Sequence, residues 1–207
     1  MKRGSLIAIE GLDRTGKTTQ TEYLLNKFKE LNIKHKLVKF PQRDTQIGKL
    51  INQYLTDKSF ELSDEAAHLI FSANRWELAS QIKDDLNNGI NIVLDRYVYS
   101  GVAYSSAKGL DFEWCLSPDK GLPKPDVTIF LKFQNIDEIS TRKGFGDERY
   151  EVAEFQDKVR IMFEKFENNK EFSKVFVDNL GKEEVHNKIW QIIKPLSEGC
   201  DEELSFF

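Results

Sequence analysis

The sequence predicts an α/β fold in which helices cover both faces of a five-stranded parallel sheet. Short apolar runs alternate with helix-length stretches along the chain, a pattern typical of sheets built from strand-helix-strand units. A glycine-rich loop follows the first apolar run and leads directly into a helical stretch. Ligands of such folds collect at the carboxyl ends of the strands, so we expect the functional site at that edge of the sheet.

Five apolar runs rich in β-branched residues are bounded by polar or turn-forming residues, as buried strands are. We predict strands over residues 5–10, 36–40, 91–95, 126–131 and 174–178. Helix-length segments lie between and after these runs. We predict helices near residues 17–31, 45–55, 63–87, 135–142, 151–169 and 182–195.

Length and composition favour a single domain over residues 1–207. With 40% hydrophobic and 31% charged residues, the chain has enough apolar side chains for a sizeable core. A net charge of -4 gives no basis for a nucleic-acid partner, which requires a basic surface. The two cysteines, Cys115 and Cys200, lack metal-ligand spacing and suit a reducing compartment. We find no signal peptide or membrane-spanning run, so we expect no membrane partner and a cytoplasmic or nuclear location.

The segment Gly11-Leu-Asp-Arg-Thr-Gly-Lys-Thr18 has the spacing of a P-loop, with a strand before it and a helix after it. Its glycines let backbone amides converge on a β-phosphate, towards which the helix also points its positive end. Lys17 can reach the outer phosphates, and the Thr18 hydroxyl can bind Mg2+. The loop therefore predicts a site for the phosphates of a nucleoside triphosphate.

Asp95 ends the third predicted strand, and Arg96 follows it directly. A carboxylate at this point can hold Mg2+ through water, and the arginine adds a second cation beside the phosphates. GTPases instead follow the comparable aspartate with a glycine-bearing switch. An exposed ion pair at the end of a strand is the alternative for these two residues alone.

Arg75 interrupts an apolar helical stripe formed by Ala67, Phe71, Leu78 and Ile82. A guanidinium on a face directed inwards needs strong acceptors, such as a buried carboxylate or the polar edge of a ligand. Phe71 lies one turn earlier on the same face and could stack on an aromatic ring beside it. The alternative, in which Phe71 is core and Arg75 pairs with a structural acid, stays open.

Two further segments bear on the site. Phe40-Pro-Gln-Arg43 adds an aromatic ring and an arginine at the end of the second strand, although an ordinary loop has the same composition. Residues 142–151 carry three basic residues and two glycines. Such a segment can close over a triphosphate and exclude water, so we predict a lid there. A solvated charged loop is the alternative.

The remaining signals point to no catalytic group. His35, His68 and His186 show no ligand spacing, and His68 is expected to be a surface or core histidine. The segment 198–207 is acidic and then aromatic, and it predicts either a frayed tail or a packed end.

Six ordered motifs make the chain resemble the thymidylate kinase family over residues 5–197. The motifs are Gly11–Thr18, Phe40–Arg43, Leu69–Trp76, Asp95–Tyr104, Gly121–Asp126 and Gly146–Glu151. The resemblance implies a three-layer P-loop nucleoside monophosphate kinase fold with a short lid. It also implies that ATP, with Mg2+, donates its γ-phosphate to dTMP, giving dTDP on the route to dTTP, and that the protein is a homodimer.

The resemblance implies roles on the ATP side. Arg14 marks the eukaryote-like class, in which the catalytic arginine comes from the P-loop, and Lys17 and Arg96 would share the catalytic role. Mg2+ would be held by Thr18 and, through water, by Asp95. The residues expected to bind ATP are Gly11, Leu12, Asp13, Arg14, Thr15, Gly16, Lys17, Thr18, Thr19 and Arg142.

The resemblance also implies roles on the acceptor side. Phe71 would stack on thymine, Arg75 would bond its O4 edge, and Tyr104 would fill the space of a ribose 2'-hydroxyl. Arg43 and Arg96 would grip the dTMP phosphate. Asp13 would take the sugar 3'-hydroxyl, Ser100 and Gly101 would lie by the base, Tyr150 would close over the substrate, and Phe40, Pro41 and Leu55 would wall the pocket.

Two other functions remain open at this point. One is a broader deoxynucleoside monophosphate kinase that also uses dUMP or dGMP, because thymine differs from uracil by one methyl group, which gives about 10- to 200-fold discrimination. The other is a nucleotide-dependent switch without catalysis. Arg14, Arg96 and the pair Phe71 and Arg75 argue against the switch, since it needs no acceptor pocket.

Overall fold

The sheet of the computed structural model has five parallel strands in the order β2-β3-β1-β4-β5. The model describes residues 2–134 and 148–207. The strands are β1 (Leu6–Gly11), β2 (His35–Lys39), β3 (Asn91–Asp95), β4 (Val127–Lys132) and β5 (Phe172–Phe176). All four neighbouring pairs are parallel. The predicted five-stranded parallel sheet is therefore confirmed, with each strand within two residues of its expected bounds.

The core lies along the three central strands. Every residue of β1 and β3 is buried, and β4 is buried up to its last residue, whereas the edge strands β2 and β5 are partly exposed. A strand covered on both faces has no side exposed to solvent, which is why these three runs are largely apolar in sequence.

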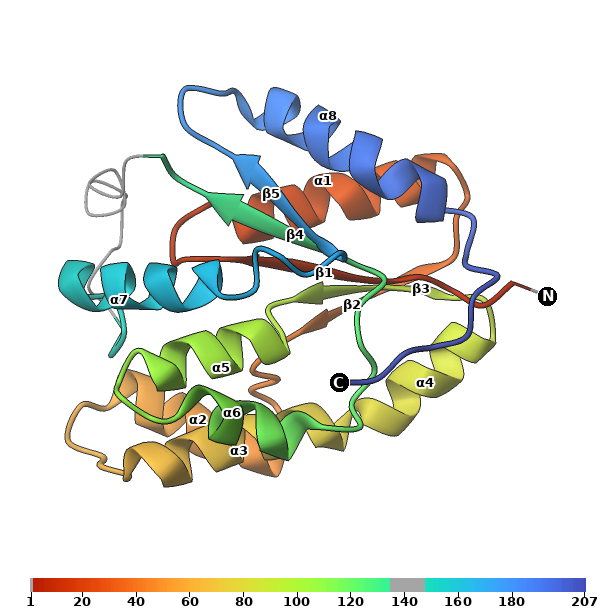
Figure 1. The fold of residues 1–207 in the computed structure, drawn as a ribbon. Helices are drawn as coiled ribbons and strands as arrows, with labels where there is room; N and C mark the ends of the chain where they lie inside the picture. The colour runs from red at the N-terminus through yellow and green to blue at the C-terminus, as the bar shows by residue number, and fades with distance from the viewer. Residues whose placement is uncertain (1, 135–147) are drawn as a thin grey trace.

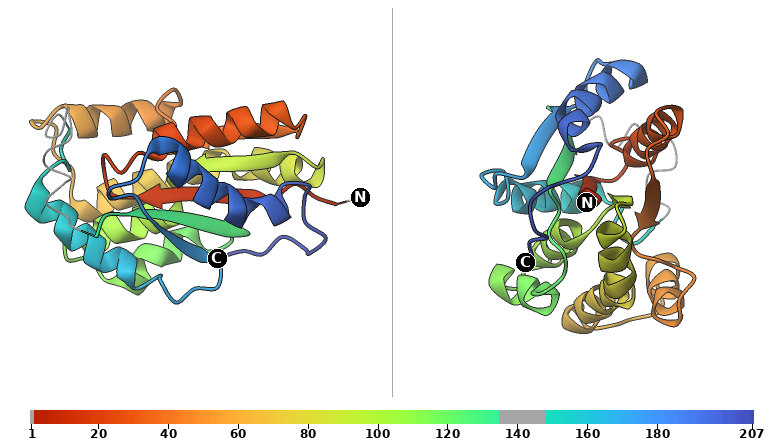
Figure 2. Two further views of the ribbon diagram at one scale, coloured as in Figure 1. Left: turned by 90° about the horizontal axis from the view of Figure 1, so that it is seen from above. Right: turned by 90° about the vertical axis from the view of Figure 1, so that its right-hand side faces the viewer.

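Helices cover both faces of this sheet (Figures 1 and 2). On one face, α1 (Lys17–Glu30) packs beside α8 (Lys182–Ile193). On the other face lie α3 (Asp64–Glu77), α4 (Ala79–Asn87) and α5 (Val98–Ser106), with α2 (Gln46–Thr56) packed on α3, and α6 (Phe112–Leu116) and α7 (Ala153–Glu164) packed on α5. Two short 3-10 turns, Ser117–Asp119 and Lys194–Leu196, follow α6 and α8. None of the helices in the described residues is long and apolar enough to cross a bilayer.

One helix prediction needs correction, two helices were missed, and one predicted helix is not tested. The single helix predicted over 63–87 is broken at Leu78, whose backbone N-H donates to Arg75 three residues earlier. The break contains no glycine or proline, so the sequence gives no sign of it. Helices α5 and α6 were not predicted, and the helix predicted over 135–142 lies outside the described residues.

The segment 198–207 is a packed end and not a frayed tail. It runs back past the start of the chain and ends beside the loop that precedes β4 (Figure 1). Isolated antiparallel bridges join Arg3 to Cys200 and Pro123 to Phe206. These bridges fix the segment at both ends.

Candidate functional site

The P-loop connects β1 to α1 in a conformation that requires its glycines. Gly11 has φ 152°, and a Cβ there would lie 2.7 Å from the carbonyl oxygen of Leu131 on the neighbouring strand. Gly16 has φ 93° and occupies the N-cap of α1, where no side chain caps the helix. The first amides of α1 are thus free of a capping side chain, as at helix ends that bind phosphate.

Lys17 is buried at the start of α1. Its Nζ donates to the carbonyl oxygen of Leu12 over 2.6 Å. Burial, together with the nearby Arg96 guanidinium, lowers the pKa of Lys17 to about 8. An anionic ligand at the loop would stabilise the charged ammonium, so the position suits a phosphate.

Thr18 and Asp95 meet where α1 begins and β3 ends. The Thr18 hydroxyl lies 3.5 Å from Oδ2 of Asp95. A hydroxyl and a carboxylate at this distance are the oxygen donors that Mg2+ prefers. The two residues predicted from the sequence therefore lie together and fit that ion.

A cavity of about 110 Å³ opens beside the P-loop. All residues predicted to bind the acceptor line it, and they are Asp13, Phe40, Pro41, Arg43, Leu55, Phe71, Arg75, Arg96, Ser100, Gly101, Tyr104 and Tyr150. Five further lining residues, not predicted as site residues, are His68, Tyr97, Ser105, Glu148 and Glu151. Segments far apart in the sequence thus converge on one cavity. Arg142 lies outside the described residues.

Arg75 reaches the cavity while paired to an internal acid. Its Nε and NH2 donate to the two carboxylate oxygens of Asp119 over 3.0 and 2.6 Å, and both residues are buried. Asp119 also accepts from the Ser72 hydroxyl over 2.7 Å. A Cβ at Gly101 would lie 2.7 Å from the Arg75 guanidinium. Glycine at 101 therefore gives the guanidinium room against the backbone of α5. Arg75 therefore pairs with a structural acid, as the alternative interpretation held, and it also lines the cavity.

Arg96 connects the P-loop to the cavity. Its backbone has φ 67°, and NH1 donates to the Gly11 carbonyl and the Ser100 hydroxyl, each over 3.1 Å. NH2 pairs with Asp13 of the P-loop. Burial alone raises the pKa of Asp13, but the charges of Arg96 and Lys17 and the bonds it accepts hold that pKa below its usual value. Asp13 is thus kept ionised against Arg96.

Two buried residues that the sequence analysis missed hold this cluster. Glu10 of β1 accepts from the backbone N-H groups of Tyr97 and Ser100 over 2.8 and 3.1 Å, at the start of α5. Burial raises the pKa of Glu10. Gln156 of α7 donates to Asp13 over 2.7 Å and accepts from its backbone N-H over 3.1 Å. The sequence could have identified both residues, because Glu10 is an acid within a predicted buried strand and Gln156 is a polar residue on an apolar helix face.

Residues 148–151 of the predicted lid form the outer rim of the cavity. Glu148 pairs with Arg43 over 2.8 Å, and Glu151 pairs with Arg14 over 2.8 Å. Arg149 fixes this rim to the end of α2, because its Nε donates to the carbonyl oxygen of Tyr54 over 2.8 Å. Of the arginines expected near the phosphates, Arg14 and Arg43 are thus paired with rim carboxylates, whereas Arg96 pairs with Asp13.

His68 lies at the inner end of the cavity as a core histidine. Its Nδ1 is 2.7 Å from the Ser105 hydroxyl and its Nε2 is 2.7 Å from the Cys115 carbonyl oxygen. Because a carbonyl can only accept, Nε2 carries the proton and Nδ1 accepts from the hydroxyl. Burial lowers the pKa of His68, which agrees with a neutral ring.

A P-loop between the first strand and the first helix, beside a cavity lined by three arginines on this parallel sheet, is typical of the class of P-loop nucleoside monophosphate kinases. The family model described as thymidylate kinase matches residues 9–189. The chain therefore belongs to the thymidylate kinase family.

Individual relatives agree with this assignment. Thymidylate kinase of Schizosaccharomyces pombe is 46% identical over 199 residues, which cover 92% of this chain and 92% of that protein. Human thymidylate kinase is 45% identical over 163 residues, which cover 78% of this chain and 76% of that protein. The solved structure of Candida albicans thymidylate kinase matches with a TM-score of 0.91 at 47% identity, covering 100% of this chain and 99% of that one.

Proposed function

We propose that this protein transfers the γ-phosphate of ATP to dTMP and releases ADP and dTDP, a step on the route to dTTP. The observation that supports this most directly is the position of Arg96. One of its nitrogens bonds Gly11 of the P-loop over 3.1 Å, and its guanidinium lines the cavity. A cation shared between donor loop and acceptor cavity is what a transfer between two nucleotides requires.

On the donor side, we propose that residues 11–19 and Arg142 bind ATP. Mg2+ would be held by the Thr18 hydroxyl and, through water, by Asp95. The Thr18 hydroxyl oxygen lies 3.5 Å from Oδ2 of Asp95. When bound, Mg2+ supplies positive charge that neutralises the phosphates.

On the acceptor side, Phe71 would stack on the thymine ring, and Arg75 would bond its O4 edge. The fork of Arg75 uses Nε and NH2 for Asp119, which leaves NH1 without a hydrogen-bond partner among the described residues. Arg43 and Arg96 would bind the monophosphate, Asp13 the 3'-hydroxyl, and the Tyr104 ring would oppose a 2'-hydroxyl. The remaining lining residues predicted from the sequence would wall the base and close over it.

The reaction needs positioning and charge more than a base. An anionic oxygen of the dTMP phosphate attacks the γ-phosphorus, a new P-O bond forms, and the bond to the β-phosphate oxygen breaks as ADP leaves. Arg14, Lys17 and Arg96 would neutralise the charge that is shared among these oxygens. Since the nucleophile is already ionised, no proton has to be removed by the protein.

A coupled assay of ADP release with dTMP, dUMP and dGMP tests the proposal. We expect turnover with dTMP to exceed that with the other two by about tenfold or more, the discrimination that contacts to one small group can give. The Candida albicans enzyme is described as having broad substrate specificity, so the other monophosphates are necessary comparisons. Absence of turnover with all three would favour a nucleotide-dependent switch.

We also propose that the protein is a homodimer. Leu69 and Trp76 lie two turns apart on α3 and are 45% and 40% exposed, and Trp114 of α6 is 36% exposed. The Trp114 ring lies 5.4 Å from that of His68, the neighbour of Leu69. Large exposed apolar side chains gathered on adjoining helices are a usual feature of subunit interfaces.

A further inference from the structure

Residues 200–207, here called the C-terminal strap, cross from the first residues of the chain to the loop that precedes β4 (Figure 1). We propose that the strap is a positioning element for the monophosphate pocket and acts through Asp119 and Tyr97. The inference rests on the proposed function, because it says that the strap affects binding of the monophosphate and not binding of ATP.

Arg3 fixes the beginning of the strap. Its backbone exchanges hydrogen bonds with Cys200 over 3.1 and 2.9 Å. Its side chain donates to the Glu202 carbonyl over 2.8 Å and forms a two-point pair with Asp126 at 2.8 and 2.6 Å. Asp126 also accepts from the backbone N-H of Leu6 over 2.7 Å, at the start of β1. The strap therefore begins from the rigid sheet.

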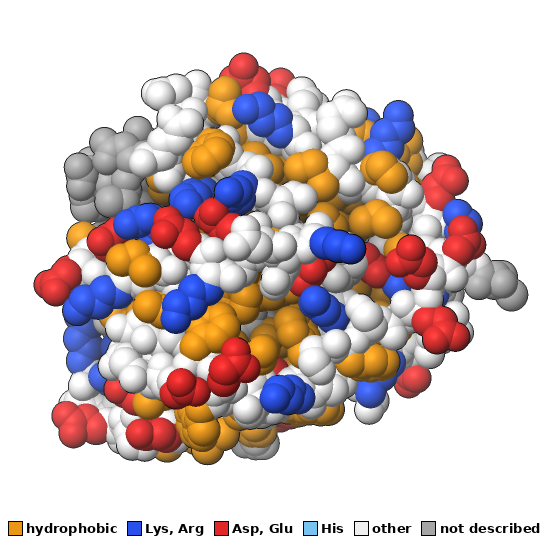
Figure 3. All heavy atoms as spheres, viewed as in Figure 1, with side chains coloured by type: hydrophobic (Ala, Val, Ile, Leu, Met, Phe, Trp, Pro, Cys, Tyr) orange, Lys and Arg blue, Asp and Glu red, His pale blue; other side chains and the backbone are white. Residues whose placement is uncertain are grey.

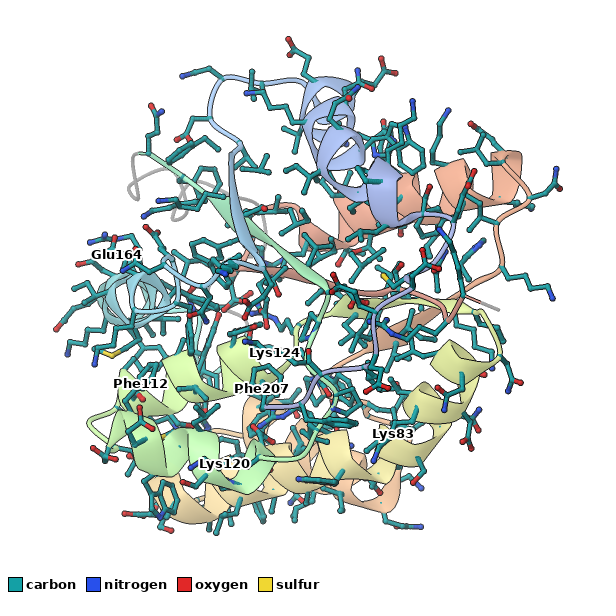
Figure 4. All side chains as sticks on the ribbon, turned by 45° about the vertical axis from the view of Figure 1, so that its right-hand side comes forward. Lys83, Phe112, Lys120, Lys124, Glu164 and Phe207 are labelled. Carbon is teal, nitrogen blue, oxygen red and sulfur yellow. The ribbon has the colours of Figure 1, made fainter. Side chains whose placement is uncertain are left out.

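The end of the strap pairs with the loop that follows Asp119. The Lys124 N-H donates to the Ser205 carbonyl over 2.8 Å, and the Phe207 N-H donates to the Leu122 carbonyl over 3.1 Å. The Gly121 N-H donates to the Phe207 carbonyl, also over 3.1 Å. Figure 4 shows Phe207 beside Lys124 of this loop. The loop thus has its backbone partners in the strap.

This pairing bears directly on Asp119. Gly121, which bonds Phe207, is two residues beyond Asp119, and Leu122 donates to the Asp119 carbonyl over 3.0 Å. Asp119 holds the Arg75 fork. A displacement of the loop would shift the carboxylate and with it the guanidinium that lines the cavity, because a two-point pair fixes both distance and angle.

The side chain of Phe207 supports a second wall of the cavity. Its ring lies 6.0 Å from the ring of Tyr97 and 5.4 Å, edge to face, from the ring of Tyr99. Tyr97 lines the cavity and its ring is 5.6 Å from that of Phe40, another lining residue. The buried Tyr97 hydroxyl has no hydrogen-bond partner among the described residues. Packing, and not hydrogen bonding, therefore sets the position of this ring.

The preceding residue provides a matched control. Phe206 is 48% exposed, and Lys83 of α4 lies over its ring at 5.5 Å. On the face shown in Figure 3, lysine and arginine side chains lie among apolar side chains around the centre. Among the described residues, the Phe206 ring packs on neither Tyr97 nor Tyr99, whereas the Phe207 ring packs on both. The two phenylalanines are adjacent in sequence but have different neighbours.

The experiment compares Phe207→Ala with Phe206→Ala in the full chain. We expect Phe207→Ala to raise KM for dTMP about tenfold, as loss of aromatic packing and of pocket geometry predicts, while KM for ATP and kcat change less than about twofold. Phe206→Ala should leave all three constants at the wild-type values. Phe207→Leu, which keeps an apolar side chain, should restore most of the dTMP affinity.

Two measurements separate positioning from folding and from the proposed function. Thermal unfolding reports global stability, and a general loss of folded protein would lower kcat without a selective change in KM. Hydrogen exchange at residues 117–124 should increase in Phe207→Ala alone, a result that needs no activity. Equal KM values in the two alanine variants, or equal rises for dTMP and ATP, would overturn the inference. An inactive wild-type protein would overturn the proposed function instead.

Discussion

The ion pair of Arg75 and Asp119 combines two-point geometry with nearly complete burial, since the side chains are 3% and 0% exposed. Removing one member of such a pair leaves an uncompensated charge, which costs about 3–5 kcal/mol of stability. Arg75→Ala therefore mixes loss of the folded state with loss of acceptor binding. A substitution that keeps the charge is the better probe.

We predict that Arg75→Lys raises KM for dTMP at least about tenfold and leaves KM for ATP unchanged, because an ammonium cannot serve Asp119 and a base edge with a fixed fork. Steady-state kinetics with each substrate varied in turn gives both constants, and thermal unfolding checks the fold. A parallel rise of both KM values would mean that Arg75 acts on structure alone.

Arg14 lies in the P-loop and pairs with Glu151 over 2.8 Å, with a third of its side chain exposed. We predict that Arg14→Ala lowers kcat by about 10^3-fold, as loss of an arginine finger does, with little change in stability. Rapid-mixing or steady-state assays at saturating ATP measure this. Arg160→Ala is the control, since that arginine pairs with Asp157 and Glu164 on α7. A rise in KM for ATP with kcat intact would contradict the assigned role.

The residues of the P-loop and the arginine on the apolar stripe could be predicted because each carries a local anomaly. Asp119 could not, since it is 44 positions from Arg75 in a short turn whose composition is that of any loop. Glu10 could have been predicted as a site residue, because a carboxylate within a buried strand needs hydrogen-bond partners. The charge of Arg75 on a buried helix face needs partners for the same reason. Its partners lie about 90 residues further on, so only the fold identifies them.

At the scale of elements, α5 shows how tertiary contacts override local preference. Its sequence contains valine, serine, tyrosine and glycine, which favour helices weakly. The helix forms because the Glu10 carboxylate accepts from its first backbone amides and because most of its residues are buried. A carboxylate at a helix N-terminus is also favoured by the helix dipole. Pattern reading alone misses such a helix.

His68 joins α3 to α5 through Ser105 and to α6 through Cys115. Burial holds the pKa of His68 in the folded protein below its usual value. Between that pKa and the pKa of about 6.5 in the unfolded chain, the unfolded chain therefore binds more protons than the folded protein does. Stability from this site is complete above about pH 6.5 and is lost as the pH falls.

We therefore predict that the melting temperature decreases when the pH is lowered from about 7.5 to about 5.5. The decrease should be smaller in His68→Gln. Differential scanning fluorimetry at both pH values measures the difference. An identical pH dependence in the variant would show that other groups, such as His186, whose pKa burial also lowers, account for it.

At the scale of the whole molecule, the sequence predicted the number and direction of the strands but not their order. Apolar runs identify strands, whereas the arrangement β2-β3-β1-β4-β5 depends on which helices pack on which face. That order puts β1 and β3 side by side. The ends of these two strands carry Gly11 and Asp95, which is why residues so distant in sequence share one site.

We predict that Leu69→Glu converts the proposed dimer to a monomer, because a charge on the apolar face proposed as the interface opposes the burial of that face. Size-exclusion chromatography with light scattering gives the mass directly. Leu31→Glu, at a 47% exposed leucine at the end of α1, should not change the mass. A wild-type monomer would refute the proposed dimer.

Two carboxylates at the rim of the cavity already pair with arginines, Glu148 with Arg43 and Glu151 with Arg14. Under the proposed function, an arriving nucleotide would replace one carboxylate on each guanidinium. The same carboxylates would return to the arginines when the products leave. Such an exchange would disfavour retention of spent nucleotide and so favour release of what has been made.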